Sequence, residues 1–134
     1  MTTKHTPQTV TGVTPHLTCA DASAAIELYT RAFGAEVLAR MPAEDGKRIM
    51  HGHLVINDGP LFVMDTFPEH GHKAETPQGF VLHLQVNDAD VWHDRAVKAG
   101  CTSTMPVQLM FWGDRYGQVR DPFGILWAIG GPNK

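Results

Sequence analysis

Two stretches of the chain repeat one short pattern, and this repeat restricts the folds that are open to it. Each copy holds a His-Leu pair, a following aspartate and a later glycine: His16-Leu17 with His83-Leu84, Asp21 with Asp88, and Gly34 with Gly100. The second copy follows the first by about 67 residues, with a one-residue slip at the glycine. A single unit of this size cannot bury both faces of a sheet. The repeat therefore predicts two paired modules around one core.

The first module is predicted over residues 13–65. An aspartate N-cap, an apolar stripe and a closing glycine predict a helix at 22–33, between Asp21 and Gly34. Turn-forming residues at 43–46 and 57–60 are typical of antiparallel hairpins. The strands that these signals separate are expected at 13–19, 36–41, 48–56 and 61–65.

The second module is predicted over residues 80–131, after a polar linker at 66–79 that contains proline, glycine and histidine. A strand is expected at 80–86, followed by a helix that Asn87 or Asp88 caps and Gly100 ends. Three strands should follow. Their two tight turns are Trp112-Gly113-Asp114 and Asp121-Pro122-Phe123-Gly124. Residues 1–12 are expected to form a polar tail.

Charge and composition exclude several classes of function. The 134 residues carry a formal net charge of −3 and no basic block, so we expect neither nucleic-acid nor membrane binding. No apolar run approaches a membrane span, and the polar start lacks a signal-peptide core, so a cytoplasmic location is expected. Cys19 and Cys101 have no metal-binding or redox spacing and are expected to be free thiols.

Three motifs carry a resemblance to a known family. They are TPHLTCADASAAIELYTRAFGAE at 14–36, GKRIMHGHLVIND at 46–58 and MPVQLMFWGDRYGQVRDPFGILW at 105–127. The chain resembles the vicinal oxygen chelate superfamily, which includes glyoxalase I, bleomycin-resistance proteins and extradiol dioxygenases, and is most similar to its PhnB-like branch. The resemblance implies an α+β fold in which two pseudo-symmetric βαβββ modules form a curved, cup-shaped mixed sheet. It also implies a homodimer.

Metal-binding members of this superfamily hold a divalent ion with four inward residues, two from each module. The resemblance places Thr14, Met64, Val81 and Ala128 at those positions. Valine and alanine offer no ligand atom, and a thioether is a weak ligand for Zn, Ni, Fe or Mn. The usual metal site is therefore expected to be lost, and no cofactor is predicted.

Two histidines keep an alternative open. His16 and His83 follow Thr14 and Val81 by two residues, so each lies on the same strand face as its neighbour. They could hold a relocated divalent metal with a third ligand such as Asp65, Gln85 or Gln118, or one of them could act as a general base. The simpler interpretation is two hydrogen-bonded histidines that line a polar cavity. His51 and His53 form a further pair on one strand.

Aromatic and amide side chains predict a pocket for a small molecule. Trp112 is expected to form a wall against a planar ligand, with Arg115 and Tyr116 beside it. The predicted pocket residues are His16, Phe62, Met64, His83, Gln85, Trp112 and Gln118. The favoured function is metal-free binding of a small molecule. The alternatives are a metal-dependent glyoxalase- or dioxygenase-like enzyme and a metal-free enzyme with a histidine base.

Overall fold

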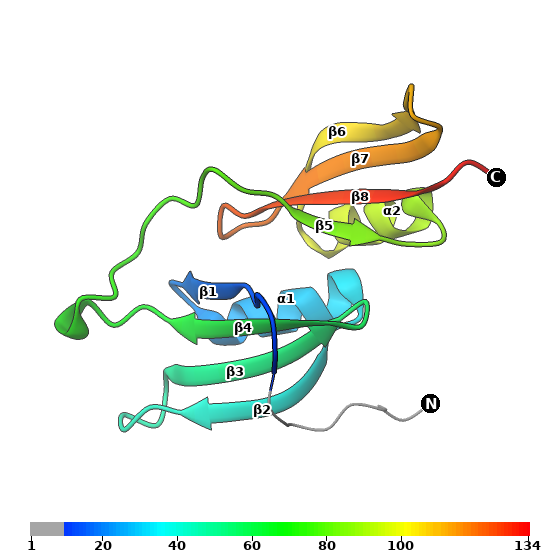
Figure 1. The fold of residues 1–134 in the computed structure, drawn as a ribbon. Coiled ribbons are helices and arrows are strands. Elements are labelled where there is room, and N and C mark those ends of the chain that lie inside the picture. Colours follow the sequence, from blue (N-terminus) through cyan, green and yellow to red (C-terminus); the bar gives the residue numbers. More distant parts are fainter. Residues whose placement is uncertain (1–9) are drawn as a thin grey trace. The chain divides into compact units, whose positions relative to one another are not determined.

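Both halves of the chain fold as β-α-β-β-β modules in the computed structural model, which describes residues 10–134 (Figure 1). The first module contains β1 (His16–Cys19), α1 (Ala22–Phe33), β2 (Glu36–Pro42), β3 (Ile49–Ile56) and β4 (Gly59–Asp65), followed by a short 3-10 helix, η1 (Pro68–His70). The second contains β5 (Leu82–Gln85), α2 (Ala89–Ala99), β6 (Thr102–Leu109), β7 (Asp114–Arg120) and β8 (Leu126–Pro132). Most of the predicted tail lies outside the described residues.

The two modules have the same strand order. The first sheet runs β1-β4-β3-β2 and the second β5-β8-β7-β6, and in each sheet the first pair is parallel and the others are antiparallel. This confirms the predicted α+β class and the duplication. One compact unit runs to residue 75 and the other starts at residue 76, except that residues 31–33 group with the second.

The predicted helix ends are confirmed by their capping bonds. Asp21 accepts the Ala24 N–H at 3.0 Å, and Gly34 ends α1 with a φ of 67°. Asp88 accepts the Val91 N–H at 3.2 Å at the start of α2, and Gly100 follows its last residue. These bonds satisfy backbone groups that a helix end otherwise leaves unpaired, which is why local sequence located both helices.

Each helix covers one face of its own sheet. In the first unit, a side chain at Gly52 would meet the Cδ1 atom of Ile26 at 3.2 Å, so α1 packs closely against β3. The strand residues Leu17, Leu54 and Val63 are buried. Because side chains alternate along a strand, their neighbours in sequence lie on the opposite face.

The turns also follow the sequence signals. Asn57 and Asp58 have φ of 50° and 67°, the left-handed pair that a tight β3–β4 hairpin requires. Asp121 accepts the Phe123 N–H at 2.9 Å and Gly124 has a φ of 89°. Cys19 and Cys101 are buried and are not joined to each other by a disulfide, as expected. No described helix is long and apolar enough to cross a membrane.

The start of the predicted linker is more ordered than its composition indicated. Phe67 is 2% exposed, and the guanidinium carbon of Arg48 lies 4.3 Å from the centre of its ring. Arg48 also pairs with Glu69 at 2.6 Å. Burial of the aromatic ring and this cation contact hold η1 against the first module. The strands β1 and β5 are shorter than predicted and begin at residues 16 and 82.

Candidate functional site

A row of histidines crosses the first sheet on the face that α1 does not cover. Phe62 on β4 is the strand partner of both His16 on β1 and His53 on β3. The centre of its ring lies 5.9 Å from that of His16, 5.0 Å from His53 and 4.8 Å from His51. Three imidazoles from two strands thus surround one phenyl ring.

Burial and mutual repulsion keep part of this row uncharged. His53 is 8% exposed although it is polar. Burial lowers the pKa of His16, and the nearby His51 and His72 lower it further. Burial and His51 likewise lower the pKa of His53. These imidazoles are therefore neutral near physiological pH, the form that can accept a proton or bind a metal.

The second sheet carries an aromatic and amide cluster. His83 stacks on Tyr116 with ring centres 6.0 Å apart and an interplanar angle of 18°, and Trp112 meets the same Tyr116 edge-on at 5.6 Å. His83 Nε2 donates to Gln85 Oε1 at 2.8 Å. Gln118 Nε2 donates to the Tyr116 hydroxyl at 3.0 Å. The phenol of Tyr116 therefore joins the indole, the imidazole and an amide.

Small residues of β8 form the floor of this cluster. His83 pairs with Ala128, and Gln85 pairs with Gly130. A side chain at Gly130 would lie 3.1 Å from the Cε1 atom of His83, so the imidazole would have to shift slightly to make room for it. Trp112 is 50% exposed at the tip of the β6–β7 hairpin, which leaves one face of its indole open to a ligand.

Asp65 has a structural role in this geometry. Its Oδ1 accepts the Ala22 N–H at 2.9 Å and its Oδ2 accepts the Ile49 N–H at 2.6 Å. The carboxylate is 5% exposed and joins the first turn of α1 to β3. Both oxygens are thus occupied by backbone donors, which weakens the case for Asp65 as a metal ligand.

The positions at which the superfamily resemblance implies metal ligands do not fit a divalent ion. Thr14 and Val81 precede β1 and β5. The strand register makes Phe62, rather than the predicted Met64, the counterpart of Ala128, because they pair with His16 and His83 respectively. Neither phenylalanine nor methionine suits Zn, Ni, Fe or Mn. Among residues 10–134, no group of three or more His, Cys, Asp or Glu side chains is placed to hold a metal.

The predicted pocket residues divide into two sets. His16 and Phe62 lie together on the first sheet, and β4 places Met64 on the same strand face as Phe62. His83, Gln85, Trp112 and Gln118 belong to the cluster on the second sheet. His16 and His83 belong to different units, so a metal site built on both stays a prediction.

Sequence reasoning gave Tyr116 too small a role. It was predicted only as a polar neighbour of Trp112, yet it contacts His83, Trp112 and Gln118. The signal was its position two residues before Gln118, which puts both side chains on one face of β7. Arg115 was also predicted to lie beside Trp112, and its guanidinium binds Asp90 at 2.7 and 3.1 Å.

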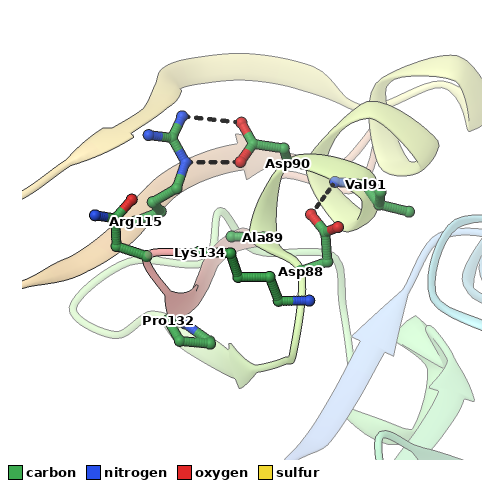
Figure 2. Close-up of a pocket in the computed structure, with 8 residues that line it drawn as sticks. Asp88, Ala89, Asp90, Val91, Arg115, Pro132 and Lys134 are labelled. Carbon is green, nitrogen blue, oxygen red and sulfur yellow. Dashed lines mark hydrogen bonds and ion pairs between the residues drawn. The ribbon is translucent and has the colours of Figure 1, made fainter.

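A cavity of about 370 Å³ also lies at the start of α2, and it contains none of the predicted pocket residues (Figure 2). Three of its charged groups already have partners: Asp88 caps the helix at Val91, and Arg115 and Asp90, both on its wall, bind each other. The cavity therefore offers weaker support for a ligand site than the two sheet faces.

Comparison with known proteins shows a similarity that spans both modules. The family described as Glyoxalase/Bleomycin resistance protein/Dioxygenase superfamily matches residues 8–129. A protein of Mycobacterium tuberculosis is 40% identical over 126 residues, which cover 90% of this chain and 74% of that protein. Protein YjdN of Escherichia coli is 31% identical over 140 residues, covering 87% of this chain and 92% of that protein.

A solved structure shows the same fold. TioX from Micromonospora sp. ML1 is similar with a TM-score of 0.72 and 26% identity, over 92% of this chain and 100% of that chain.

Proposed function

Given that the chain belongs to the glyoxalase/bleomycin resistance protein/dioxygenase superfamily, we propose that it binds a small molecule without the metal that many members use. The observation that carries this proposal is the cluster of Trp112, Tyr116 and His83 on the second sheet. Stacked and edge-on rings present flat apolar surface, while Gln85 and Gln118 add donors and acceptors. This combination suits a planar organic ligand with a few polar groups.

The chemistry of the former ligand positions supports the metal-free part of the proposal. Ala128 has no donor atom, and its counterpart Phe62 contributes a ring where a carboxylate would be needed. An aromatic ring in the middle of the first sheet favours contact with organic surface over coordination. We further propose membership of the PhnB-like branch, a homodimer and a cytoplasmic location, on the strength of the sequence motifs.

A second candidate function is a metal-free enzyme with a histidine base. The observation in its favour is the lowered pKa of His16, which burial produces and neighbouring imidazoles reinforce. A neutral imidazole can accept a proton from a carbon or oxygen acid at physiological pH. A metal-dependent enzyme would instead need His16 and His83 to converge on one ion.

The test compares two variants of the β6–β7 hairpin in a fluorescence titration with a panel of planar aromatic compounds. Trp112→Ala should weaken binding about tenfold, because stacking on an aromatic wall contributes roughly that factor. Leu109→Ala is the matched control, since Leu109 is similarly exposed on β6 and should leave affinity unchanged. Equal affinities for both variants and the wild type would exclude the second-sheet cluster as the ligand site. Turnover of any bound compound would favour the enzyme instead.

A further inference from the structure

The imidazoles of the first sheet have no hydrogen-bond partner in the part of the chain that the structure describes. Among the described residues, the side chains of His16, His51 and His53 form no hydrogen bond; they contact one another and Phe62 only through their rings. Buried polar groups in folded proteins are nearly always hydrogen-bonded. His53 is more than nine-tenths buried as a residue, but its ring nitrogens are not fully enclosed, so they are open to a group from outside the protein.

The hydroxyl of a threonine nearby in the sequence also lacks a hydrogen-bond partner among the described residues. Thr14 Oγ1 is buried and has no hydrogen-bond partner among the described residues. Thr14 precedes His16 by two residues at the entry to β1, which itself lies beside β4 (Figure 1). A hydroxyl before β1 and several imidazole nitrogens on β1 and β3 thus lie unpaired in one sheet. Together they can donate several hydrogen bonds to one acceptor-rich group.

Among residues 10–134, no negatively charged group is found to act on His16 or His53. The charged or titratable groups that act on His16 are His51 and His72, and the one that acts on His53 is His51. The β2 partners of His51 and His53 are Met41 and Ala39, and the β4 residues on this face are Phe62 and Met64, none of which carries a charge. Asp65 directs both oxygens to backbone N–H groups elsewhere.

We propose that this row is a subsite for a small carboxylate, held by His16, His51, His53 and Thr14, that binds together with a proton. The inference rests on the proposed binding function and deepens it, because it names the chemical class of one part of the ligand. The carboxylate oxygens accept hydrogen bonds from the imidazoles and the hydroxyl, and the phenyl ring of Phe62 supports the adjoining apolar part of the ligand.

Proton linkage predicts the direction in which the affinity of the subsite changes with pH. In the free protein, burial lowers the pKa of His16 and His53, so both are neutral at physiological pH. A bound anion favours the charged imidazole and raises these pKa values, so binding takes up protons and becomes tighter as pH falls. Binding of a divalent metal has the opposite pH dependence, because the metal binds neutral imidazole and releases protons.

The test uses acetate as the probe and acetamide as its uncharged match, at constant ionic strength. The imidazole Cε1–H signals are followed by nuclear magnetic resonance in a pH titration of the full chain. We expect acetate at about 0.1 M to raise the titration midpoints of His16 and His53 by roughly one pH unit, equivalent to a tenfold preference for the protonated form. Acetamide should leave the midpoints unchanged.

Two variants assign the effect to the row. His53→Gln should reduce the acetate response of His16, and His51→Gln serves as an independent variant of the same row. His93→Gln is the matched control, because His93 lies on α2 and contacts Ser103 in the other unit. It should leave the acetate response of the row intact.

Midpoints that respond equally to acetate and acetamide, or to neither, would overturn the subsite. So would proton release with Zn²⁺ in the absence of any acetate response. Planar aromatic compounds that bind through Trp112 in the same preparation would show that the proposed function survives the loss of this inference.

Discussion

At the scale of single residues, the buried carboxylate of Asp121 holds the turn between β7 and β8. Asp121 is 4% exposed; its Oδ1 accepts the N–H groups of Phe123 and Ile125 at 2.9 and 3.0 Å, and its Oδ2 accepts Trp127 Nε1 at 3.0 Å. The turn is therefore tied to the first residues of β8. Burial and the charge of Asp121 also raise the pKa of Cys101 to about 12, which keeps this thiol protonated and unreactive.

Replacement of Asp121 by alanine should destabilise the protein substantially. The change leaves three N–H donors without an acceptor in a buried position, and we expect a loss of about 3 kcal/mol in the free energy of unfolding. Urea denaturation measures this loss. Asp94→Ala is the control, because Asp94 pairs with Lys98 on the exposed face of α2 and should cost less than about 0.5 kcal/mol. Similar losses in both variants would contradict the assigned role.

At the scale of elements, β8 passes so close to the connection between β5 and α2 that the second module needs a glycine there. A side chain at Gly131 on β8 would overlap the carbonyl oxygen of Val86, which directly follows β5, and would lie 3.5 Å from the Ala89 nitrogen at the start of α2. The last strand, the first strand and the helix of this module therefore meet at one glycine. The backbone carbonyl cannot move without shifting the β5–α2 connection.

Gly131→Ala should consequently be more damaging than an ordinary glycine substitution. We expect a loss of about 3 kcal/mol, because overpacking against backbone is relieved only by moving β5 or α2. Gly59→Ala provides the comparison, since its new side chain would meet the nearest atom, the Ile56 oxygen, at 3.5 Å, an ordinary contact. Thermal unfolding followed by circular dichroism measures both. Equal melting temperatures would show that the β5–α2 connection is more compliant than its geometry indicates.

At the scale of the whole molecule, the two units share an architecture and differ in the chemistry of their uncovered faces. The first face carries imidazoles around Phe62, and the second carries Tyr116 with an indole, an imidazole and amides. Duplication therefore supplied two similar sheets that now present different groups. Neither set supplies the four converging ligands that the superfamily resemblance implies for metal-binding members.

The purified protein should consequently contain less than about a tenth of an equivalent of Mn, Fe, Ni or Zn, because a structural or catalytic site needs three or more converging ligands. Plasma mass spectrometry of protein prepared without added metal provides the measurement. A stoichiometric metal that is lost in His83→Ala and retained in His93→Ala would favour the metal-dependent alternative and remove the metal-free proposal.

The sequence alone determined the features that depend on neighbours along the chain. Helix α1 lies between Asp21 and Gly34, and α2 begins directly after Asp88, as predicted. These boundaries can be predicted locally because a cap and its partner are only a few residues apart. The Asp-Pro-Phe-Gly turn and the order of elements in both modules also followed from local patterns.

Only the tertiary structure decided which distant side chains meet. Parallel pairing of β1 with β4 made Phe62 the neighbour of His16, and antiparallel pairing added His53. A shift of one residue in either register would have turned a different set of side chains to this face, and nothing local in β1 specifies its partner on β4. For the same reason Asp65 became a link to α1 and β3, although its sequence context allowed a metal ligand.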